Sequence, residues 1–577
     1  MKITGAQLLV EALKKENTQF VFGYTGAAVI PIFDCLYNQD SIKVVVPRHE
    51  QGLVHAADGY ARATGKPGIC LVTSGPGATN TITGLATAYY DSVPIVCFTG
   101  QVPLNLIGND AFQEADIIGM SRSVTKHSFM VTKREEMGAI IKKAFYIATS
   151  GRPGPVVVDL PSNIIKETGS SIYPDEIEIR GYKPVINGHT GQIKKAVELI
   201  KKSRMPLFLA GGGIKISKAG EIFYKAVEKT GIPVVATLQG LGSISTQHPL
   251  FIGMLGMHGT YAANKAVSEC DVLISVGTRF SDRITGKLSE FAPNAKIIHI
   301  DIDSAAISRN VPVHIPIVGD ARLILYEIEP QLTFCECSEW IKRVNGLKES
   351  NPLLSVNGKE RISPMEAVKA ICEEFDDAII TTDVGQHQMW TAQFGTFKKP
   401  GSLITSGGLG TMGFGLPAAI GAQMGNIHKK VVCISGDGGF QMNVQELATA
   451  VLNELPLICI IFNNEYLGMV RQWQGFFYDK RYSGTCMKRR RDCPLQCDGQ
   501  IVSCPVYIPD FIKLAEAYGV KGIRVLKKED LRTALKMAND YKKGPVLIEL
   551  LIERESNVLP MVPSGAATTQ MITEGVI

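Results

Sequence analysis

Two polar residues, Asp437 and Asn464, stand where together they could hold a metal ion. Asp437 follows the apolar run 431–435, Asn464 follows a second apolar run, 457–462, and the stretch 444–451 between them has helical spacing. A strand–helix–strand unit brings the carboxyl ends of both strands to one edge of a parallel sheet. An Asp carboxylate and an Asn carbonyl at that edge could share one Mg²⁺, which completes its shell with water and phosphate.

Glycines around Asp437 point to a phosphate at the same place. Because Gly436, Gly438 and Gly439 lack side chains, the backbone there can approach a phosphate closely. A lone Gly-Asp-Gly would favour a tight turn with a capping Asp. The second oxygen ligand after the next strand favours a metal–diphosphate site instead.

The composition is that of a globular protein with several domains. The chain has 577 residues, of which 45% are hydrophobic and 20% charged, and a formal net charge of +5. This length suggests about three or four domains, and the small net charge argues against nucleic acid as a main partner. No apolar stretch is long enough to span a membrane, and the first residues lead directly into an amphipathic helix without a signal peptide. Most cysteines stand singly in apolar runs, as is typical of a reducing compartment, so we expect a cytoplasmic protein.

Alternating strand and helix patterns predict an α/β protein with three doubly wound parallel-sheet domains. The expected domains are residues 1–165, 190–335 and 360–550, followed by a tail at 551–577. Two polar stretches, 166–191 and 336–359, are interpreted as connections. Expected strands include 44–46, 68–72, 94–98, 206–210 and 297–301.

Several blocks along the chain resemble the acetohydroxyacid synthase (acetolactate synthase) family of thiamine diphosphate enzymes. The Gly-Asp-Gly and Asn-Asn spacing at 436–464 is similar to that family's cofactor motif, and the resemblance runs from about Gly5 to Ile572. Further blocks that carry it are 48–50, 73–77, 255–259, 385–390 and 407–417. The resemblance implies pyrimidine-binding, central FAD-binding and diphosphate-binding domains, with thiamine diphosphate, Mg²⁺ and FAD as cofactors.

Glu50 is the first candidate catalytic residue. It follows an expected strand at 42–46 and precedes an Ala-rich helix at 52–63, so its position alone is more typical of a helix cap. By the resemblance, Glu50 instead donates a proton to the aminopyrimidine of thiamine diphosphate, whose amino group then removes the thiazolium C2 proton. The resemblance also places Met412 under the bent cofactor and Gln113 near the reacting centre.

The resemblance implies further thiamine diphosphate contacts and supports the metal and phosphate residues that the spacing already indicates. The metal ligands would be Asp437, Asn464 and the backbone carbonyl of Tyr466. The cofactor contacts would be Pro76, Asn80, Val384, Gly385, Gln386, His387, Gly410, Gly436, Gly438, Gly439, Gly468 and Met469.

A glycine run at 211–213 follows an expected strand and by itself indicates only a turn. Together with other blocks it resembles the family's FAD site, in which the flavin is not needed for net redox chemistry. The residues so implied are Arg152, Gly211, Gly212, Gly213, Met257, His258, Gly277, Arg279, Asp301, Ile302 and Asp320.

Arg283 and Trp473 are the candidate substrate residues. By the resemblance, Arg283 binds the carboxylate of the second 2-oxo acid through two parallel hydrogen bonds, and Trp473 shapes the pocket for its alkyl group. Phe112, Met469 and Val470 would line the same funnel. The alternatives are a solvated pair of Arg283 with Asp282, and packing of Trp473 against 476–477.

The resemblance implies acetolactate synthase activity. Pyruvate would lose CO₂ on thiamine diphosphate, and the hydroxyethyl enamine would attack a second pyruvate or 2-oxobutyrate, in the first common step of valine, leucine and isoleucine biosynthesis. The implied assembly is a homodimer or homotetramer with its site between subunits, and a small regulatory subunit. A catabolic FAD-independent acetolactate synthase, a pyruvate oxidase-like flavoenzyme and a non-catalytic scaffold protein stay open as alternatives.

The chain departs from the family pattern in two ways. Thr25, Ala27 and Ser162 replace a usual Pro, Gly and Lys, which bears on substrate affinity and inhibitor response but not on the cofactors. An insertion, Cys486–Ile508, carries four basic residues at 488–491 and cysteines at 486, 493, 497 and 504. It lacks a Cys-x-x-Cys pair, so free thiols, a bound metal and a disulfide all stay open.

Overall fold

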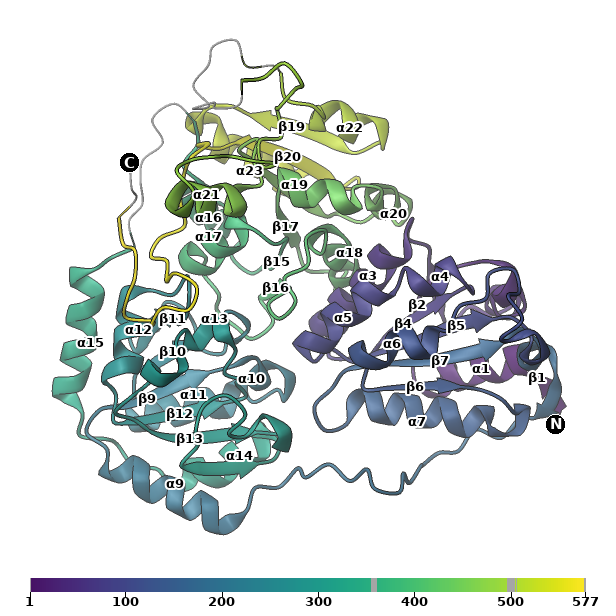
Figure 1. Cartoon of the computed structure of the whole chain (residues 1–577), viewed down its shortest axis with the longest axis horizontal. Coiled ribbons are helices and arrows are strands. Elements are labelled where there is room, and N and C mark those ends of the chain that lie inside the picture. The colour runs from purple at the N-terminus through teal and green to yellow at the C-terminus, as the bar shows by residue number, and fades with distance from the viewer. Residues whose placement is uncertain (1, 354–360, 495–503, 505, 575–577) are drawn as a thin grey trace.

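The computed structural model describes residues 2–353, 361–494, 504 and 506–574. Three six-stranded parallel sheets, each flanked by helices, form three domains at the corners of a triangle (Figure 1). The predicted α/β class with three doubly wound sheets is therefore confirmed. Among the described residues, no helix is both long enough and apolar enough to cross a bilayer.

The first domain is built on the strand order β3-β2-β4-β5-β7-β6. Its strands are β2 (Phe20–Tyr24), β3 (Lys43–Val45), β4 (Gly68–Val72), β5 (Ile95–Gln101), β6 (His127–Met130) and β7 (Pro155–Pro161). Its helices are α1 (Gly5–Lys15), α2 (Ile30–Tyr37), α3 (Glu50–Thr64), α4 (Pro76–Thr79), α5 (Ile82–Asp91), α6 (Ile117–Ser121), α7 (Met137–Thr149) and α8 (Ser162–Lys166). All residues of β4, β5 and β7 are buried, as expected for parallel strands covered on both faces.

The third domain repeats this topology with the order β16-β15-β17-β18-β20-β19, so both sheets read 2-1-3-4-6-5 when their strands are counted along the chain. Its strands are β15 (Ile379–Thr382), β16 (Leu403–Thr405), β17 (Val431–Gly436), β18 (Ile458–Asn463), β19 (Lys521–Val525) and β20 (Val546–Leu551). Its helices are α16 (Pro364–Glu374), α17 (Gln386–Phe394), α18 (Gly415–Gly425), α19 (Asp437–Phe440), α20 (Glu446–Leu452), α21 (Gly468–Phe477), α22 (Phe511–Ala517) and α23 (Lys528–Asp540).

The central domain has the order β11-β10-β9-β12-β13-β14, which reads 3-2-1-4-5-6 along the chain. Its strands are β9 (Pro206–Ala210), β10 (Val234–Ala236), β11 (Phe251–Met254), β12 (Val272–Val276), β13 (Lys296–Asp301) and β14 (Ile315–Val318). Its helices are α9 (Thr190–Lys202), α10 (Gly212–Ile216), α11 (Gly220–Thr230), α12 (Tyr261–Glu269), α13 (Asp282–Thr285), α14 (Ala321–Ile328) and α15 (Ser338–Ser350). This is the strand order of dinucleotide-binding sheets, which bind ligands beyond the carboxyl ends of the strands where the order reverses, here β9 and β12.

Helices α3 and α18 fix the first domain against the third. A Cβ added at Gly59 would collide with the carbonyl of Ala418, and one added at Gly421 would collide with the carbonyl of Ala56. Glycine at both positions therefore lets the two helix backbones come into direct contact.

Both polar connections turn out to contain regular structure. Within 166–191, β8 (Thr168–Ser170) pairs antiparallel with β1 (Lys2–Thr4). Within 336–359, the interpretation as a connection was wrong for α15, because Trp340 and Val344 are buried and the Trp340 indole donates to the carbonyl of Pro206 at 2.9 Å. The buried residues of α15 are Trp340, Val344 and Leu347. They form an apolar stripe that is too narrow to stand out in the sequence among the many polar residues of this helix.

The C-terminal tail runs from the third domain along the central domain (Figure 1). Arg471 of α21 donates to the side chain of Asn557 at 2.8 Å, and the backbone N–H of Val562 donates to the carbonyl of Met257 at 2.8 Å. The tail thus joins α21 to the central domain.

Candidate active site

Two cavities meet where the three domains come together. The larger, of about 1310 Å³, is lined by residues of all three domains, and the smaller, of about 60 Å³, lies at the carboxyl edge of β15, β17 and β18. Both are lined by Val384, Gly385, Met412, Met469 and Val470. Met412 therefore stands at the junction of the two cavities.

Asp437 and Asn464 lie together in the smaller cavity, at the ends of β17 and β18. Asp437 is 2% exposed, and its Oδ2 accepts from the backbone N–H of Glu465 at 2.8 Å. Asn464 donates from Nδ2 to Oε1 of Gln386 at 3.3 Å. Burial, reinforced by the Glu465 carboxylate, raises the pKa of Asp437 to about 8. A divalent cation bound there would favour the charged form of the carboxylate and so lower this pKa.

The smaller cavity has room and polar groups for an anionic ligand. His387 is buried, and its Nε2 has no hydrogen-bond partner among the described residues. Burial lowers the pKa of His387 to about 3, so the ring is neutral and one nitrogen can donate. A Cβ at Gly436 would lie 2.9 Å from His387 Nδ1, and one at Gly468 would collide with Gln386. Glycine at these positions therefore lets the backbone pack closely against the His387 and Gln386 side chains at the edge of this cavity.

Asp383 holds the loops of this cavity, and sequence reasoning missed it. Its carboxylate accepts from the backbone N–H groups of Val384 at 2.7 Å, Gly413 at 2.9 Å and Gly415 at 3.1 Å. Burial raises the pKa of Asp383 to about 6. Asp383 thereby fixes the turns on both sides of Met412. An Asp directly after an apolar strand and before Gly385 was the available signal.

Glu50 lies on the first domain in a separate group. Its side chain is 9% exposed, and its Oε2 accepts from Asn80 Nδ2 at 3.0 Å. Pro76 begins α4 beside this pair, and Gln113 has a left-handed φ of +59°. These residues line neither the larger nor the smaller of these cavities.

Phe112 lines neither of these two cavities in its own chain. Its side chain is 88% exposed, because the loop after β5 places it on the surface of the first domain. Within one chain, the expected site residues therefore fall into two separate sets. One set, with Glu50, lies on the first domain, and the other, with Asp437, lines the cavities between the domains.

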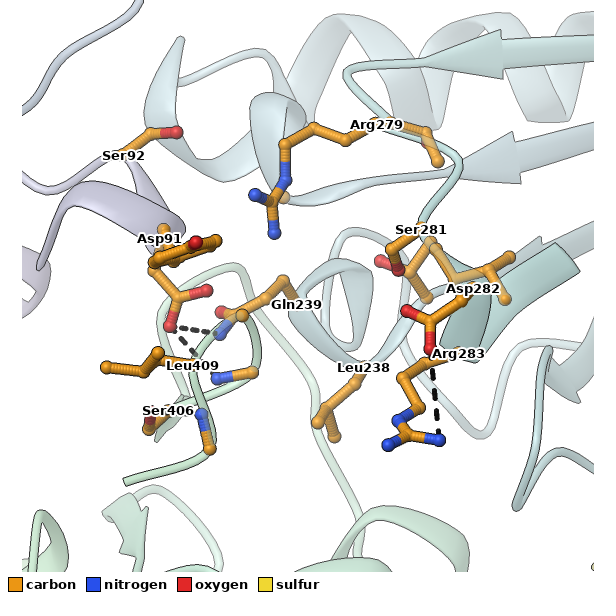
Figure 2. Close-up of a pocket in the computed structure, with 18 of the residues that line it drawn as sticks. Asp91, Ser92, Leu238, Gln239, Arg279, Ser281, Asp282, Arg283, Ser406 and Leu409 are labelled. Atoms are coloured by element: carbon orange, nitrogen blue, oxygen red, sulfur yellow. Dashed lines mark hydrogen bonds and ion pairs between the residues drawn. The ribbon is translucent and has the colours of Figure 1, made fainter. Parts of the chain in front are cut away.

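The larger cavity contains nearly all residues expected to bind FAD. Those that line it are Arg152, Gly212, Gly213, Met257, His258, Gly277, Arg279, Asp301, Ile302 and Asp320. Gly211 is the exception, since it lies behind the lining, where a Cβ would collide with the carbonyl of Gly277. In Figure 2 the Arg279 guanidinium extends between Asp91 on one side and Arg283 on the other.

Arg283 and Trp473 also line the larger cavity, as Met412 does. Arg283 is held only loosely, since its Nη1 lies 3.9 Å from Asp282 Oδ2 and its side chain is 59% exposed. Trp473 packs edge-on against Phe477, with ring centroids 5.8 Å apart. Arg283 thus lies beside Asp282, and Trp473 packs against Phe477, as the alternative interpretations required. Both side chains nevertheless line the cavity.

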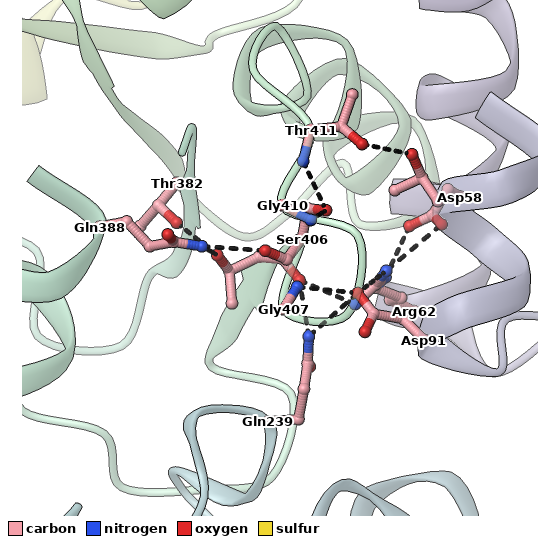
Figure 3. Close-up of polar contacts among 12 residues, drawn as sticks. Asp58, Arg62, Asp91, Gln239, Thr382, Gln388, Ser406, Gly407, Gly410 and Thr411 are labelled. Atoms are coloured by element: carbon pink, nitrogen blue, oxygen red, sulfur yellow. Dashed lines mark hydrogen bonds and ion pairs between the residues drawn. The ribbon is translucent and has the colours of Figure 1, made fainter. Parts of the chain in front are cut away.

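A polar network joins the three domains at the wall of this cavity (Figure 3). Asp91 Oδ2 accepts from Arg62 at 2.9 Å, from Gln239 of the central domain at 3.2 Å and from the backbone N–H of Gly407 at 2.9 Å. Arg62 also pairs with Asp58 at 2.6 Å. Sequence reasoning missed this network, since its members are far apart in the chain and carry no motif.

The Met412 turn is linked to this network through Ser406. The Ser406 Oγ accepts from the backbone N–H groups of Gly410 and Thr411, each at 3.1 Å. The wall of the larger cavity is thereby connected to the junction of the two cavities.

Comparison with known families gives three matches in chain order. Residues 3–120 match "Thiamine pyrophosphate enzyme, N-terminal TPP binding domain", residues 193–328 the central domain of the same enzymes, and residues 383–550 their C-terminal TPP binding domain.

Three curated relatives are similar over nearly the whole chain. The "Probable acetolactate synthase large subunit" of Methanococcus aeolicus is 47% identical, over 99% of this chain and 95% of its own. The "Acetolactate synthase isozyme 3 large subunit" of Escherichia coli (strain K12) is 42% identical, over 99% and 98%. The "Acetolactate synthase, chloroplastic" of Arabidopsis thaliana is 46% identical, over 99% and 84%.

Proposed function

The chain belongs to the thiamine pyrophosphate enzyme family, among the acetolactate synthase large subunits, and from this premise we propose that it catalyses the acetolactate synthase reaction. Pyruvate is decarboxylated, and its remaining two-carbon unit is joined to a second pyruvate or to 2-oxobutyrate. This is the first common step of valine, leucine and isoleucine biosynthesis. The observation that carries the proposal is similarity to these large subunits over 99% of the chain.

The thiamine diphosphate and Mg²⁺ assignment is supported by the smaller cavity. Asp437, Asn464 and the carbonyl of Tyr466 would hold the metal, and the diphosphate would lie against 384–387, 436–439 and 468–469. When bound, thiamine diphosphate supplies a carbanion that adds to a 2-oxo acid and accepts the electrons left by CO₂. The neutral His387 and the glycine backbone around it suit an anion there.

The protein's own part is to move one proton and to orient the acceptor. Glu50, fixed by Asn80, would give a proton to the aminopyrimidine ring of the cofactor. Met412, at the junction of the cavities, would support the bent cofactor. Arg283 would hold the acceptor's carboxylate, and Trp473 would contact its alkyl group.

The arrangement of Glu50 supports an active site formed between two copies of the chain. Glu50 and Asp437 belong to separate sets within one chain, and Phe112 is 88% exposed on the face that carries Gln113. We infer that Glu50, Gln113 and Phe112 of one copy face the metal cavity of the other. A homodimer is then the smallest active unit, and a homotetramer is compatible with it. The names of the relatives as large subunits support a small regulatory partner.

FAD is assigned to the larger cavity. The 3-2-1-4-5-6 strand order, the volume of about 1310 Å³ and the cations Arg152 and Arg279 suit a dinucleotide with phosphates. This favours a flavin-containing synthase over a FAD-independent one. The proposal keeps the domain limits expected from the sequence. Residues 1–165 would bind the pyrimidine, 190–335 would bind FAD and 360–550 would bind the diphosphate, while 551–577 would form an active-site tail.

A cytoplasmic location also belongs to the proposal. It is supported by eight buried free thiols among the described residues, Cys70, Cys97, Cys270, Cys335, Cys337, Cys372, Cys433 and Cys459.

Product analysis under anaerobic conditions tests the proposed reaction. With thiamine diphosphate, Mg²⁺ and FAD supplied, pyruvate should give 2-acetolactate and one CO₂ for every two pyruvates, while the flavin stays oxidised. The contact of both cavities at Met412 is the observation that keeps a pyruvate oxidase-like reaction as a second candidate. Bleaching of the flavin by pyruvate at the catalytic rate, without acetolactate, would establish that reaction instead.

A further inference from the structure

The insertion Cys486–Ile508 reaches the metal-binding turn at both of its described ends. Residues 495–503 and 505, and with them Cys497, lie outside the described residues. The described cysteines 486, 493 and 504 are free thiols and form no cluster suited to a metal. The contacts of the two ends nevertheless give the insertion a role.

The first end lies along the residues that follow Asn464. Tyr466 and Cys486 form an antiparallel bridge, and the backbone N–H of Met487 donates to the carbonyl of Glu465 at 2.9 Å. Just before the insertion, the carbonyl of Thr485 accepts from the N–H of Leu467 at 2.9 Å. The start of the insertion is therefore paired with the segment that carries the expected carbonyl ligand, Tyr466.

Lys488 contributes a buried positive charge to this turn. Its Nζ lies 3.1 Å from Glu465 Oε1, and the two side chains are only 12% and 6% exposed. Arg554 Nε lies 3.1 Å and Arg361 Nη1 3.7 Å from the other carboxylate oxygen of Glu465. The backbone of Glu465 is left-handed, with a φ of +63°. Ionic contacts on both oxygens thus hold a residue whose backbone conformation is uncommon for Glu.

The conformation of Glu465 matters because its backbone N–H donates to Asp437 Oδ2 at 2.8 Å. A rotation of this residue would remove a hydrogen bond from the metal-binding carboxylate and displace its neighbours Asn464 and Tyr466. The Glu465 side chain also adds negative charge next to Asp437. Lys488 pairs with that carboxylate and thereby helps to keep the Glu465 side chain in place.

The second end supports Asp437 from the opposite direction. Gln441 Nε2 donates to the Tyr507 hydroxyl at 3.1 Å and to the backbone carbonyl of Asp437 at 3.0 Å. The Tyr507 ring is 9% exposed and packs on Phe511 at a centroid distance of 5.9 Å. Tyr507 therefore fixes the side chain that holds the other face of the Asp437 turn.

We propose that the two described ends of the insertion are positioning elements for the metal: Lys488 and Tyr507 hold Glu465 and Gln441, which in turn hold Asp437. The inference rests on the proposed Mg²⁺–thiamine diphosphate site and adds residues of a segment that departs from the family pattern. Partners that orient metal ligands commonly change metal affinity by 10- to 100-fold when removed. Lys488 and Tyr507 touch neither metal nor substrate, so they should affect cofactor affinity and not the chemical step.

The test is titration of full-length apoprotein with Mg²⁺ and thiamine diphosphate, followed by tryptophan fluorescence and calorimetry. Lys488→Met should weaken Mg²⁺-dependent cofactor binding about tenfold, while kcat at saturating cofactor stays within about twofold. Lys488→Arg should bind as wild type. Glu465→Gln should weaken binding to a similar extent, and Lys488→Met combined with Glu465→Gln should bind no more weakly than the weaker single variant, because both changes remove the same contact. Tyr507→Phe should weaken binding about threefold to tenfold through loss of the hydroxyl.

Lys225→Met is the matched control, since it breaks an exposed pair with Glu221 whose atoms lie 2.8 Å apart, and it should not change cofactor binding. Unchanged affinity in folded Lys488→Met and Tyr507→Phe would overturn the proposal, as would a double variant whose loss of affinity equals the combined losses of Lys488→Met and Glu465→Gln. If Lys488→Met does not fold, Tyr507→Phe decides alone. Failure of the wild type to bind the Mg²⁺ complex would instead overturn the proposed cofactor site.

Discussion

Glu50 and Asn80 are joined by a hydrogen bond of 3.0 Å, from Asn80 Nδ2 to Glu50 Oε2, on a part of the first domain that does not line the cavity of Asp437. The Glu50 side chain is held by Asn80 of its own domain, while the backbone N–H groups of Arg48 and His49, at the start of α3, donate to Glu446 of the third domain at 3.0 and 3.1 Å. The third domain thus fixes the start of α3 without bringing Glu50 into the cavity of Asp437, and the proposed function requires the Glu50 set of one copy to meet the Asp437 cavity of another.

Glu50→Gln should retain cofactor binding and lose turnover by about 10²- to 10⁴-fold, because an amide cannot carry out the carboxylate's proton transfer. Cofactor affinity and exchange of the cofactor's C2 proton into D₂O should be measured together. Exchange near the wild-type rate would remove Glu50 from this role.

Asp437→Ala should lose Mg²⁺-dependent binding of thiamine diphosphate, since the diphosphate charge is then poorly compensated. The measurement is activity as a function of both cofactors at limiting concentrations, with removal of Mg²⁺ by a chelator as the parallel experiment on the wild type. Unchanged activity would mean that 436–438 is only a structural turn.

Trp473→Leu should change the choice of acceptor more than the decarboxylation of pyruvate. In the proposed pocket the extra methyl group of 2-oxobutyrate would meet the indole, and one methylene in an apolar pocket is worth roughly 1–3 kcal/mol, so the preference should fall about tenfold or more. The measurement is the ratio of the two products when pyruvate and 2-oxobutyrate compete as acceptors, together with thermal unfolding of the variant. Phe477→Leu is the control, because it removes the ring against which Trp473 packs. An unchanged product ratio in a folded Trp473→Leu variant would refute the pocket assignment.

Asp159 predicts a pH dependence of stability. It is fully buried, accepts from Thr99 at 2.6 Å and Gln101 at 3.2 Å, and burial raises its pKa from 3.8 to about 7. Between these values the folded state binds the extra proton, so stability falls as pH rises through this window and the loss is complete above about 7. Its size is on the order of 4 kcal/mol at most.

Asp159→Asn keeps a partner for both neighbours and cannot ionise. Its Tm relative to wild type should therefore be higher at pH 8 than at pH 5. The same Tm difference at both pH values would show that Asp159 does not titrate in this range.

The sequence was sufficient to predict those strands and residues whose place in the fold depends on a local pattern. The apolar runs at 68–72 and 206–210 form β4 and β9 at those residues, and the Asp437–Asn464 pair follows from two adjacent strands. It was insufficient where distant segments meet. Asp91 and Gly407 are 316 positions apart, and their contact depends on how three domains dock. The place of Phe112 stays a prediction for the related reason that its expected neighbours belong to another copy of the chain in the proposed assembly.

Complementation between the two inactive variants tests most directly whether the active site forms between two chains. Glu50→Gln and Asp437→Ala, dissociated together and reassociated in equal amounts, should regain about a quarter of wild-type activity. In the proposed dimer half of the pairs are mixed, and each mixed pair contains one site with both residues intact. Each variant treated alone should stay inactive. If Glu50 and Asp437 acted within one chain, every site in the mixture would lack one of them, and no recovery would contradict the account.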